Sequence, residues 1–315
     1  MSSIISWKLA LSSAAAGMLL CSSQAFAVDW AKVPATDIAL FYPAQISMEK
    51  LVTKGRHSGG SKFLAGKNCF ACHGNIDERS IGGLMVDDPD NEPKPIVGKP
   101  SFVNVKVKVA HDTDKVYINL DFDPGKQPNS MMDKEFETKV ALMIDDGAVP
   151  EVGRAGCYAV CHDNLNSMPS AREETTKYVS ASRVVMSPMG GSEIKPQADI
   201  DKLHAAGGFI EYWQARLKPG AKAVPVDGWI LEKRTENKTP AVATDATQNG
   251  TAWSVTFSRK LKGAGENHKD IVPGKIYNVG FSIHAGYTQQ RFHYVSLERT
   301  LVLDEGKADF VAAKQ

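Results

Sequence analysis

The sequence predicts a mainly β fold with some α, in which a small helical or irregular N-terminal segment precedes a β-sandwich. Two observations support this class. Residues 103, 105, 107 and 109 are all valine and alternate with polar residues, which is the period of a half-buried strand. Further strand-like runs follow as far as residue 303, separated by clusters of Gly, Asn and Asp. We therefore expect the sheet to begin after Pro100.

The first 27 residues predict a cleaved export signal. Lys8 precedes an apolar run over residues 9–20, and Ala25-Phe26-Ala27 supplies the small residues of a cleavage site. The run is short for a membrane span, and a bulky leucine precedes Cys21, where a lipoprotein site needs a small residue. We expect cleavage after Ala27 and a periplasmic protein, rather than a permanent anchor or a lipoprotein.

Residues 28–100 predict an N-terminal segment with little core of its own. The segment is expected to be irregular and helical, with a short helix at residues 48–54. Four prolines lie among charges between residues 87 and 100, a composition that resists both helix and sheet. We therefore divide the mature chain into residues 28–100, which end in this Pro-rich linker, and a second unit over residues 101–315.

The second unit is predicted to contain about seven or eight strands, which suggests a sandwich. Residues 198–217 are predicted to be helical, with Ile210, Trp213 and Leu217 on one stripe that packs in the core. The strands are expected at residues 103–109, 117–122, 138–145, 229–233, 252–257, 276–283 and 292–303.

The pentapeptide Cys69-Phe70-Ala71-Cys72-His73 matches the attachment motif for c-type haem. In such motifs two thiols bind the porphyrin covalently, and the histidine reaches the iron from the proximal side. The alternatives are a thioredoxin-like redox pair, half of a zinc site or a disulfide. The flanking residues lack the αβ context of a redox pair, and a zinc site needs four ligands. We therefore predict covalent haem at Cys69 and Cys72, with His73 on the iron.

A second motif, Cys157-Tyr158-Ala159-Val160-Cys161-His162, has one more residue between its cysteines. Thiols at positions i and i+4 still share one face of a helical turn. A short disulfide between Cys157 and Cys161 is the alternative, but it gives no role to His162. We predict a second covalent haem with His162 as its proximal ligand. Because Cys21 leaves with the signal, the two motifs use all four remaining cysteines.

Each iron of an electron carrier needs a sixth ligand, for which histidine and methionine are the usual candidates. His57 and Met85 are nearest in sequence to the first motif. His57 precedes Gly59 and Gly60 in a predicted turn, where the backbone can approach a cofactor closely. We expect His57 to be the ligand and keep Met85 as its rival. The other interpretations are an ordinary surface histidine and a methionine that fills the core.

The distal ligand of the second haem is predicted from strand periodicity. The strand expected over residues 292–303 places His293 on its apolar face, where a neutral imidazole needs a partner. His284 groups instead with polar residues of its own predicted strand. We therefore expect His293 to bind the iron, with Met168, Met189 and His284 as rivals.

Three stretches after Pro100 resemble a known family. They are Ala110-His111-Asp112 with Val116-Tyr117, then Gly207-Gly208-Phe209-Ile210-Glu211-Tyr212-Trp213-Gln214-Ala215-Arg216, and finally Arg291-Phe292-His293-Tyr294-Val295-Ser296. The family is the haem-binding γ-subunit domain of ethylbenzene dehydrogenase and dimethylsulfide dehydrogenase, and the resemblance covers about two thirds of the mature chain. It implies a β-sandwich that holds haem between sheet and loops.

The chain departs from those family members that hold b-type haem through Met and Lys. It has the second Cys motif instead, and His293 lies near the place of the family's lysine. It thus resembles the c-type branch, in which a diheme cytochrome combines an N-terminal haem segment with this domain. Residues 40–43 (Leu-Phe-Tyr-Pro) and 57–59 (His-Ser-Gly) are also similar to that branch, which supports His57 as a ligand.

These observations predict a periplasmic diheme c-type cytochrome that transfers electrons and is not itself an enzyme. The resemblance implies a redox subunit or partner of a molybdenum oxidoreductase, and another expected partner is a membrane quinol oxidase-type donor of a respiratory chain. The alternative is a diheme peroxidase or small-nitrogen reductase with one open iron site, although no Arg/His/Glu constellation lies beside either motif. A haem-based sensor would need an output domain, which the sequence does not indicate.

The charge balance excludes two further classes of partner. Lys and Arg number 37 and Asp and Glu number 36, which gives no support for binding to nucleic acid or to an anionic membrane surface. After the signal, no run is apolar enough to span a bilayer.

Overall fold

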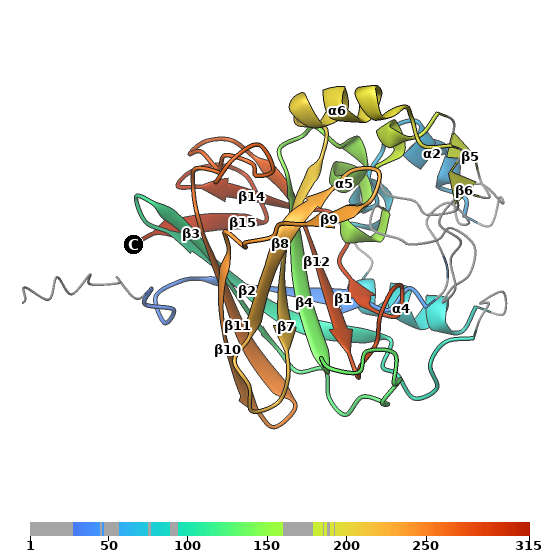
Figure 1. Cartoon of the computed structure of the whole chain (residues 1–315). Helices are drawn as coiled ribbons and strands as arrows, with labels where there is room; N and C mark the ends of the chain where they lie inside the picture. The colour runs from blue at the N-terminus through green and yellow to red at the C-terminus, as the bar shows by residue number, and fades with distance from the viewer. Residues whose placement is uncertain are drawn as a thin grey trace, which may run out of the picture.

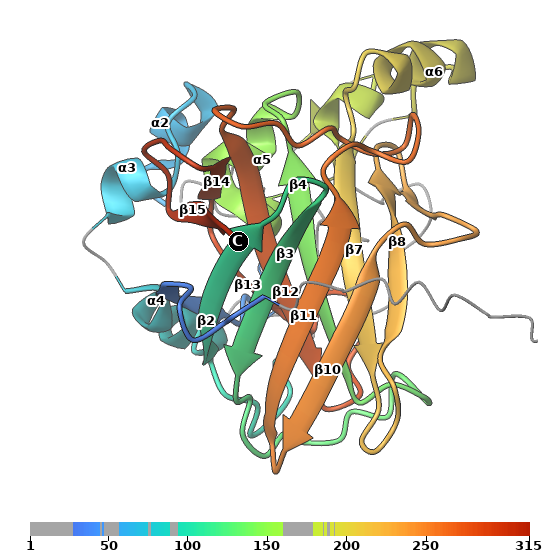
Figure 2. The same ribbon diagram turned by 90° about the vertical axis from the view of Figure 1, so that its left-hand side faces the viewer.

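The computed structural model describes residues 28–44, 46, 57–74, 77–88, 94–159, 179–184, 186–187, 190–191 and 193–315. Thirteen of the described strands form one sheet, which bends into two layers (Figures 1 and 2). The short helices gather on one side of this sheet (Figure 1). The predicted class, mainly β with some α, is confirmed. The predicted signal over residues 1–27 and the predicted helix at residues 48–54 lie outside the described residues.

The two layers are built from strands that are mostly antiparallel neighbours. The first layer runs β10 (Ala243–Asn249), β11 (Ala252–Lys260), β3 (Lys115–Phe122), β2 (Phe102–His111) and β1 (Ala35–Phe41). The second runs β12 (Tyr277–Ala285), β4 (Thr138–Asp145), β7 (Ile210–Leu217), β8 (Val224–Ile230) and β9 (Arg234–Glu236). Three strands connect the layers: β13 (Tyr294–Val295), β14 (Arg299–Leu303) and β15 (Phe310–Lys314).

The remaining described elements are short. The helices are α2 (Gly60–Leu64), α3 (Phe70–His73), α4 (Glu78–Val86), α5 (Pro150–Ala155) and α6 (Gln197–Ala205), with 3-10 turns η1 (Gly156–Ala159) and η3 (Ser180–Ser182). A separate two-stranded sheet pairs β5 (Met186–Ser187) with β6 (Gly190–Gly191). Among the described residues, none of the helices has the length and apolar character needed to cross a membrane.

The main core lies between the two layers. Alternate residues of each strand point into it, as the period of two requires. In β2 these are the four valines singled out in the sequence, and each is less than 5% exposed. Trp213 of β7 and Phe257 of β11 meet across the layers, with ring centroids 6.4 Å apart. The opposite face of the second layer remains available for other contacts, and this face carries one of the two sites below.

The helix predicted over residues 198–217 is wrong in its second half. The chain is helical in α6 but extended in β7, and Gly207 separates the two with a φ of +76°. A left-handed φ favours glycine and ends a helix. Trp213, Ala215 and Leu217 then enter the main core at every second position. The apolar spacing was therefore that of a strand, not of a helix.

The strand predicted over residues 292–303 is not continuous. Residues 296–298 separate β13 from β14, and His293 precedes β13 in a bend. The Ser296 hydroxyl accepts a hydrogen bond from the Phe281 N–H at 2.9 Å, which replaces a regular ladder contact at this position. His293 is buried, at 4% exposure, but strand alternation is not the reason.

Other strand predictions agree more closely with the structure. Those at 103–109, 117–122, 138–145 and 252–257 lie in β2, β3, β4 and β11, and the one at 276–283 begins one residue before β12. The one at 229–233 overlaps only the end of β8. The prediction missed β1, which pairs with β2 from Ala35 to Phe41. The segment before the Pro-rich linker thus contributes a strand to the main sheet. The division of the chain at residue 100 stays a prediction.

Candidate functional site

A first pocket surrounds the pentapeptide motif, between α2, α3, α4 and the end of β1. It contains His57, Cys69, Cys72, His73 and Met85. Its walls are mainly apolar and come from segments far apart in sequence: Phe41, Ile46, Phe63, Ile81, Leu84, Tyr158 and Leu297. We call this cavity the first pocket.

The pentapeptide forms a single helical turn. Cys69 is the N-cap of α3, and its carbonyl accepts hydrogen bonds from the N–H groups of Cys72 at 3.1 Å and His73 at 2.8 Å. Both thiols and the imidazole therefore arise from one turn and line one cavity. Burial is the main reason that the pKa of the Cys69 thiol is raised, so this sulfur is protonated and neutral.

His57 and His73 face one another across the first pocket. Their Nε2 atoms are 3.4 Å apart, and their rings are inclined by only 26°. The Nδ1 atoms of both rings are buried and have no hydrogen-bond partner within the described parts of the chain. Gly59 permits this arrangement, because a Cβ there would lie 2.8 Å from Cε1 of His57. Burial and, secondarily, His73 lower the pKa of His57, which favours the neutral imidazole that binds metals.

These groups fit the requirements of one c-type haem. Two thiols lie on one helical turn, two imidazole Nε2 atoms are directed at each other, and the surrounding walls are apolar. Met85 is buried in the same pocket, so the rival ligand is also within the site. The facing pair, however, consists of His57 and His73.

The helical turn is fixed to the sheet by buried polar contacts. The Cys69 N–H donates to the Arg154 carbonyl at 2.9 Å, and the Phe70 N–H donates to the Glu298 carboxylate at 2.7 Å. Burial raises the pKa of Glu298 to about 7. Beside it, Arg299 donates to Glu78 at 2.5 Å and lies over the Phe70 ring. The position of the first motif thus depends on residues more than 200 positions away.

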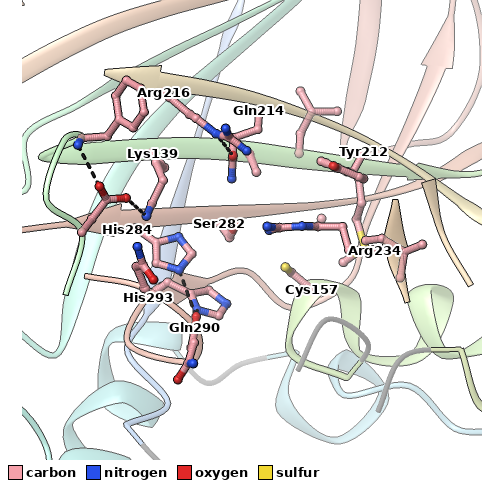
Figure 3. A pocket seen from close by; sticks show the side chains of 18 of the residues that line it. Lys139, Cys157, Tyr212, Gln214, Arg216, Arg234, Ser282, His284, Gln290 and His293 are labelled. Carbon is pink, nitrogen blue, oxygen red and sulfur yellow. Dashed lines mark hydrogen bonds and ion pairs between the residues drawn. The ribbon is translucent and has the colours of Figure 1, made fainter. Parts of the chain in front are cut away.

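A second pocket lies on the outer face of the second layer, and Cys157 forms part of its wall (Figure 3). Strand register arranges its floor in rows across β12, β4 and β7. The rows are Gly280–Met143–Tyr212, Ser282–Ala141–Gln214 and His284–Lys139–Arg216. The cavity measures about 470 Å³, within the range of about 300–1,000 Å³ that small-molecule and cofactor sites occupy.

Cys157 can approach this floor because residue 280 is a glycine. A Cβ at position 280 would lie 2.8 Å from the Cys157 backbone nitrogen and 2.9 Å from Cε of Met143. Cys157 is 5% exposed. The other residues of the second motif, Cys161 and His162, lie outside the described residues, as do the rival ligands Met168 and Met189.

Two histidines stack at one end of the second pocket. The ring centroids of His284 and His293 are 4.5 Å apart with an inclination of 26° (Figure 3). Both rings donate to the Gln290 carbonyl, His284 through Nε2 at 2.9 Å and His293 through Nδ1 at 2.5 Å. A carbonyl only accepts, so these nitrogens carry the protons. Metal-ligating histidines commonly use such a bond to orient the opposite nitrogen, which for His293 is Nε2.

The sequence interpretation placed His284 with polar residues and treated it as a rival of His293. The structure brings both residues to the same pocket, because the polar face of β12 is the floor of that pocket. Burial lowers the pKa of His284 well below its usual value, so this ring is neutral. The choice between the two as a ligand stays a prediction.

The sequence interpretation missed the polar residues that line the second pocket. Lys139, Tyr212, Gln214 and Arg216 were given no role in a site, and three of them fall within the wrongly predicted helix. A usable signal was present, because Tyr212, Gln214 and Arg216 alternate with the apolar residues of β7. Correct identification of that strand would have placed all three on one face.

The two pockets are separated by consecutive residues of η1. Cys157 lines the second pocket, and Tyr158 lines the first. The Tyr158 ring packs edge-to-face on Phe41 with centroids 5.3 Å apart, and its hydroxyl donates to the Ile46 carbonyl at 3.1 Å. Gly156 precedes them with a φ of +56°, and a Cβ there would collide with the Leu297 carbonyl.

Comparison with known proteins identifies the class of this chain. The family model described as ethylbenzene dehydrogenase matches residues 27–251. The chain therefore belongs to the ethylbenzene dehydrogenase family.

Relatives that match almost the whole chain are cytochromes c. Cytochrome c-552 of Stutzerimonas stutzeri is 33% identical over 291 residues, which cover 91% of each protein. Cytochrome c-551 of Rhodocyclus tenuis is 28% identical over 291 residues, which cover 92% of this chain and all of the relative. Among solved structures, a family 9 carbohydrate-binding module of Caldicellulosiruptor kristjanssonii in complex with cellotriose is 11% identical over 62% of this chain and 65% of that one, with a TM-score of 0.28. A score this low does not establish a shared fold.

Proposed function

We propose that this chain is a periplasmic diheme c-type cytochrome that transfers electrons. One observation carries the proposal: His57 and His73 face each other at 3.4 Å in a pocket that also contains Cys69 and Cys72. Family membership and the similarity to two cytochromes c support a haem c electron-transfer protein. Two covalent haems, one on each motif, are the more specific part of the proposal.

The second pocket supports a second haem. Its wall contains Cys157, and its far end contains the stacked pair His284 and His293. Cys161 would supply the second thioether, His162 the proximal ligand, and His293 the distal ligand. Ala141 and Ser282 are neighbours in the middle row of the floor, and their small side chains leave room above them for a flat group. Bound haem supplies one-electron chemistry; the side chains hold it in place and exclude water.

The first pocket favours a carrier over a catalyst. The Nε2 atoms of His57 and His73 are directed at each other, so both imidazoles would bind a haem iron placed between them and would leave it no position for a substrate. In a periplasmic carrier the electrons would pass to and from redox partner proteins. The expected partners are a molybdenum oxidoreductase, of which this chain would be a subunit or partner, and a membrane quinol oxidase-type donor.

The test is intact mass together with EPR on the purified exported protein. We expect the mass of the chain after cleavage at Ala27 plus two haems, and two low-spin irons that bind carbon monoxide slowly. A single haem would overturn the second site. A high-spin iron that reduces peroxide or nitrite rapidly would overturn the carrier function in favour of a diheme enzyme.

Variants at the first pocket sharpen the test. His57→Ala is expected to convert one haem to high spin, whereas Met85→Ala is the matched control and leaves both haems low-spin. The opposite result would show that Met85 is the distal ligand and that His57 is only a neighbour of His73.

A further inference from the structure

We propose that Glu298 takes up a proton when the first haem is reduced, so that this protein transfers protons together with electrons. The inference rests on the proposed haem at Cys69 and Cys72, and it goes beyond the carrier function proposed above. A redox partner protein supplies the electron to the iron. A proton from the solvent forms an O–H bond with the Glu298 carboxylate, and oxidation of the iron reverses both steps.

Glu298 lies beside the helical turn that would carry the first haem. Its Oε1 atom accepts a hydrogen bond from the Phe70 N–H at 2.7 Å, and Phe70 lies between the two cysteines of the motif. After burial, the charge of Glu298 is the main cause that raises the pKa of the Cys69 thiol. The carboxyl group is therefore close to the sulfur that would be bonded to the porphyrin. A charge there would act on the iron through a buried and weakly screened region.

The ionised form of Glu298 is poorly stabilised by its surroundings. The residue is 7% exposed, and its enclosed Oε2 atom has no hydrogen-bond partner among the described residues. A buried carboxylate oxygen without a donor favours the protonated, neutral form. Burial accordingly raises the pKa of Glu298 to about 7, so both forms are populated near neutral pH.

The nearest charged side chains do not hold Glu298 in one ionisation state. Arg299 follows it in sequence, but the Arg299 guanidinium donates to Glu78 of α4 at 2.5 Å, so this positive charge is already matched by a carboxylate. The charge of Glu78 adds to the effect of burial and raises the pKa of Glu298 further. Burial raises the pKa of Glu78 as well, which makes Glu78 the rival group for a proton.

Glu298 also lines a cavity of about 430 Å³ next to the first pocket. Asp309 lies in the same wall, where its carboxylate accepts hydrogen bonds from the N–H and the hydroxyl of Thr300 at 2.8 and 2.7 Å. From α5 and β12 the cavity receives Gly153 and Asn278, neither of which is ionisable. Glu298 thus differs from Asp309, because the hydrogen bonds from Thr300 stabilise the ionised form of the aspartate.

The redox state of the first haem and the charge of Glu298 influence each other. Reduction adds one negative charge beside the carboxyl group, and an added negative charge raises the pKa of a nearby acid. By linkage, protonation of Glu298 favours the reduced iron by the same factor. In the second pocket the described acids are unlike Glu298, because Asp133 is paired with Lys139 and Glu135 is exposed. The effect of Glu298 should therefore act on the first haem.

The experiment measures the reduction potentials of both haems by spectroelectrochemistry in the holoprotein between about pH 5 and about pH 9. Ionised Glu298 favours the ferric form, so the equilibrium constant for reduction of the first haem should fall by about tenfold across this range, or about 59 mV for one electron. Glu298→Gln keeps an acceptor for the Phe70 N–H but cannot ionise. This variant should keep the low-pH potential of the wild type across the whole range.

Three further measurements assign the effect. In His57→Ala the haem that stays low-spin is the second one, which identifies the two wild-type potentials. Glu135→Gln is the matched control at the second pocket, and it should leave the pH dependence of the first haem unchanged. A pH indicator dye should report uptake of a fraction of a proton when the wild-type first haem is reduced at an electrode near neutral pH. This last measurement does not depend on the folding of a variant.

Three results would overturn the inference. The first is a Glu298→Gln protein with two haems whose potentials depend on pH as in the wild type. The second is a pH dependence that is lost in Glu78→Gln and kept in Glu298→Gln, which would assign the proton to Glu78. The third is reduction of the wild-type first haem without proton uptake. A mass that shows no haem on the first motif would instead overturn the proposed function.

Discussion

The two pockets are built on opposite principles. The first is formed by short helices and a turn, and its four proposed haem-binding residues lie within 17 positions, from His57 to His73. The second is laid out on the regular face of a sheet, and its lining residues extend from Asp133 to His293. The difference teaches that one proposed cofactor can be held by a local motif in one site and by strand register in the other.

The largest expected effect comes from the element that both pockets share. Gly156→Ala introduces a side chain at a φ of +56° and against the Leu297 carbonyl, so the free energy of unfolding should fall by about 3 kcal/mol. Urea denaturation and haem content measure the result, and both haems should be affected. Gly147→Ala is the control: its φ is +93°, but nothing lies within 4 Å of a Cβ, so only about 1 kcal/mol is expected. Equal losses in the two variants would show that the junction is not tightly packed.

Gly280→Ala should damage the second pocket alone. The new methyl group would overlap Cys157 and Met143, and such overpacking costs about 2 kcal/mol. We expect partial loss of the second haem by mass, with the first haem unchanged. Gly83→Ala in α4, where a Cβ meets nothing within 4 Å, is the control and should be neutral or stabilising. Loss of the first haem in Gly280→Ala would contradict the separation of the two pockets.

We expect the free energy of unfolding to depend on pH through Glu298, which holds the first motif in place. The folded pKa of Glu298 is raised to about 7, above its value in the unfolded chain, so the stability that it contributes is present at low pH and is lost as the pH rises through 7. Between pH 5 and 8 the free energy of unfolding should fall by up to about 2 kcal/mol. Glu298→Gln keeps an acceptor for the Phe70 N–H and should remove this part of the pH dependence. An identical pH profile in the variant would exclude Glu298 as its source.

The smallest effect is expected at the tyrosine between the pockets. Tyr158→Phe removes one hydrogen bond to the Ile46 carbonyl but keeps the ring on Phe41, so the free energy of unfolding should fall by about 1 kcal/mol. Both haems should keep their spectra. Tyr158→Ala, which removes the ring, should cost about 3 kcal/mol or more. If Tyr158→Phe lowers the free energy of unfolding as much as Tyr158→Ala does, then the hydroxyl, rather than the ring, keeps the two pockets separate.

The sequence predicted the first pocket better than the second for a physical reason. Cys69, Cys72 and His73 are tied by the geometry of one helical turn, which spacing alone specifies. The glycines after His57 were predicted to let the backbone approach a cofactor closely, which stays a prediction; what the structure shows is a close approach of Gly59 to the His57 ring. The pairing of Glu298 with the Phe70 N–H could not be predicted, because nothing local relates these two positions.

The second pocket depends on which strands are neighbours. His284, Lys139 and Arg216 form one row only because β12, β4 and β7 pair in a particular register. Ile210, Trp213 and Leu217 fit a helical stripe as well as they fit a strand, so the sequence interpretation assigned the wrong period to β7. The break between helix and strand lies at the Gly207-Gly208 pair, where Gly207 has a φ of +76°. Periodicity identified β2, β3 and β4 because their apolar runs were long and flanked by clear turns.

Cys157 and Tyr158 are adjacent in sequence but line different pockets, and this has a consequence for electron transfer between the pockets. If both pockets hold haem as proposed, the material between the two cofactors includes a single peptide unit with an aromatic ring on one side and a thioether on the other. Electrons cross short distances through bonded and packed atoms far faster than they cross water. The two haems would then form one electron-transfer path through the protein. One end of this path would lie near the surface at Cys72, and the other would be buried at Cys157.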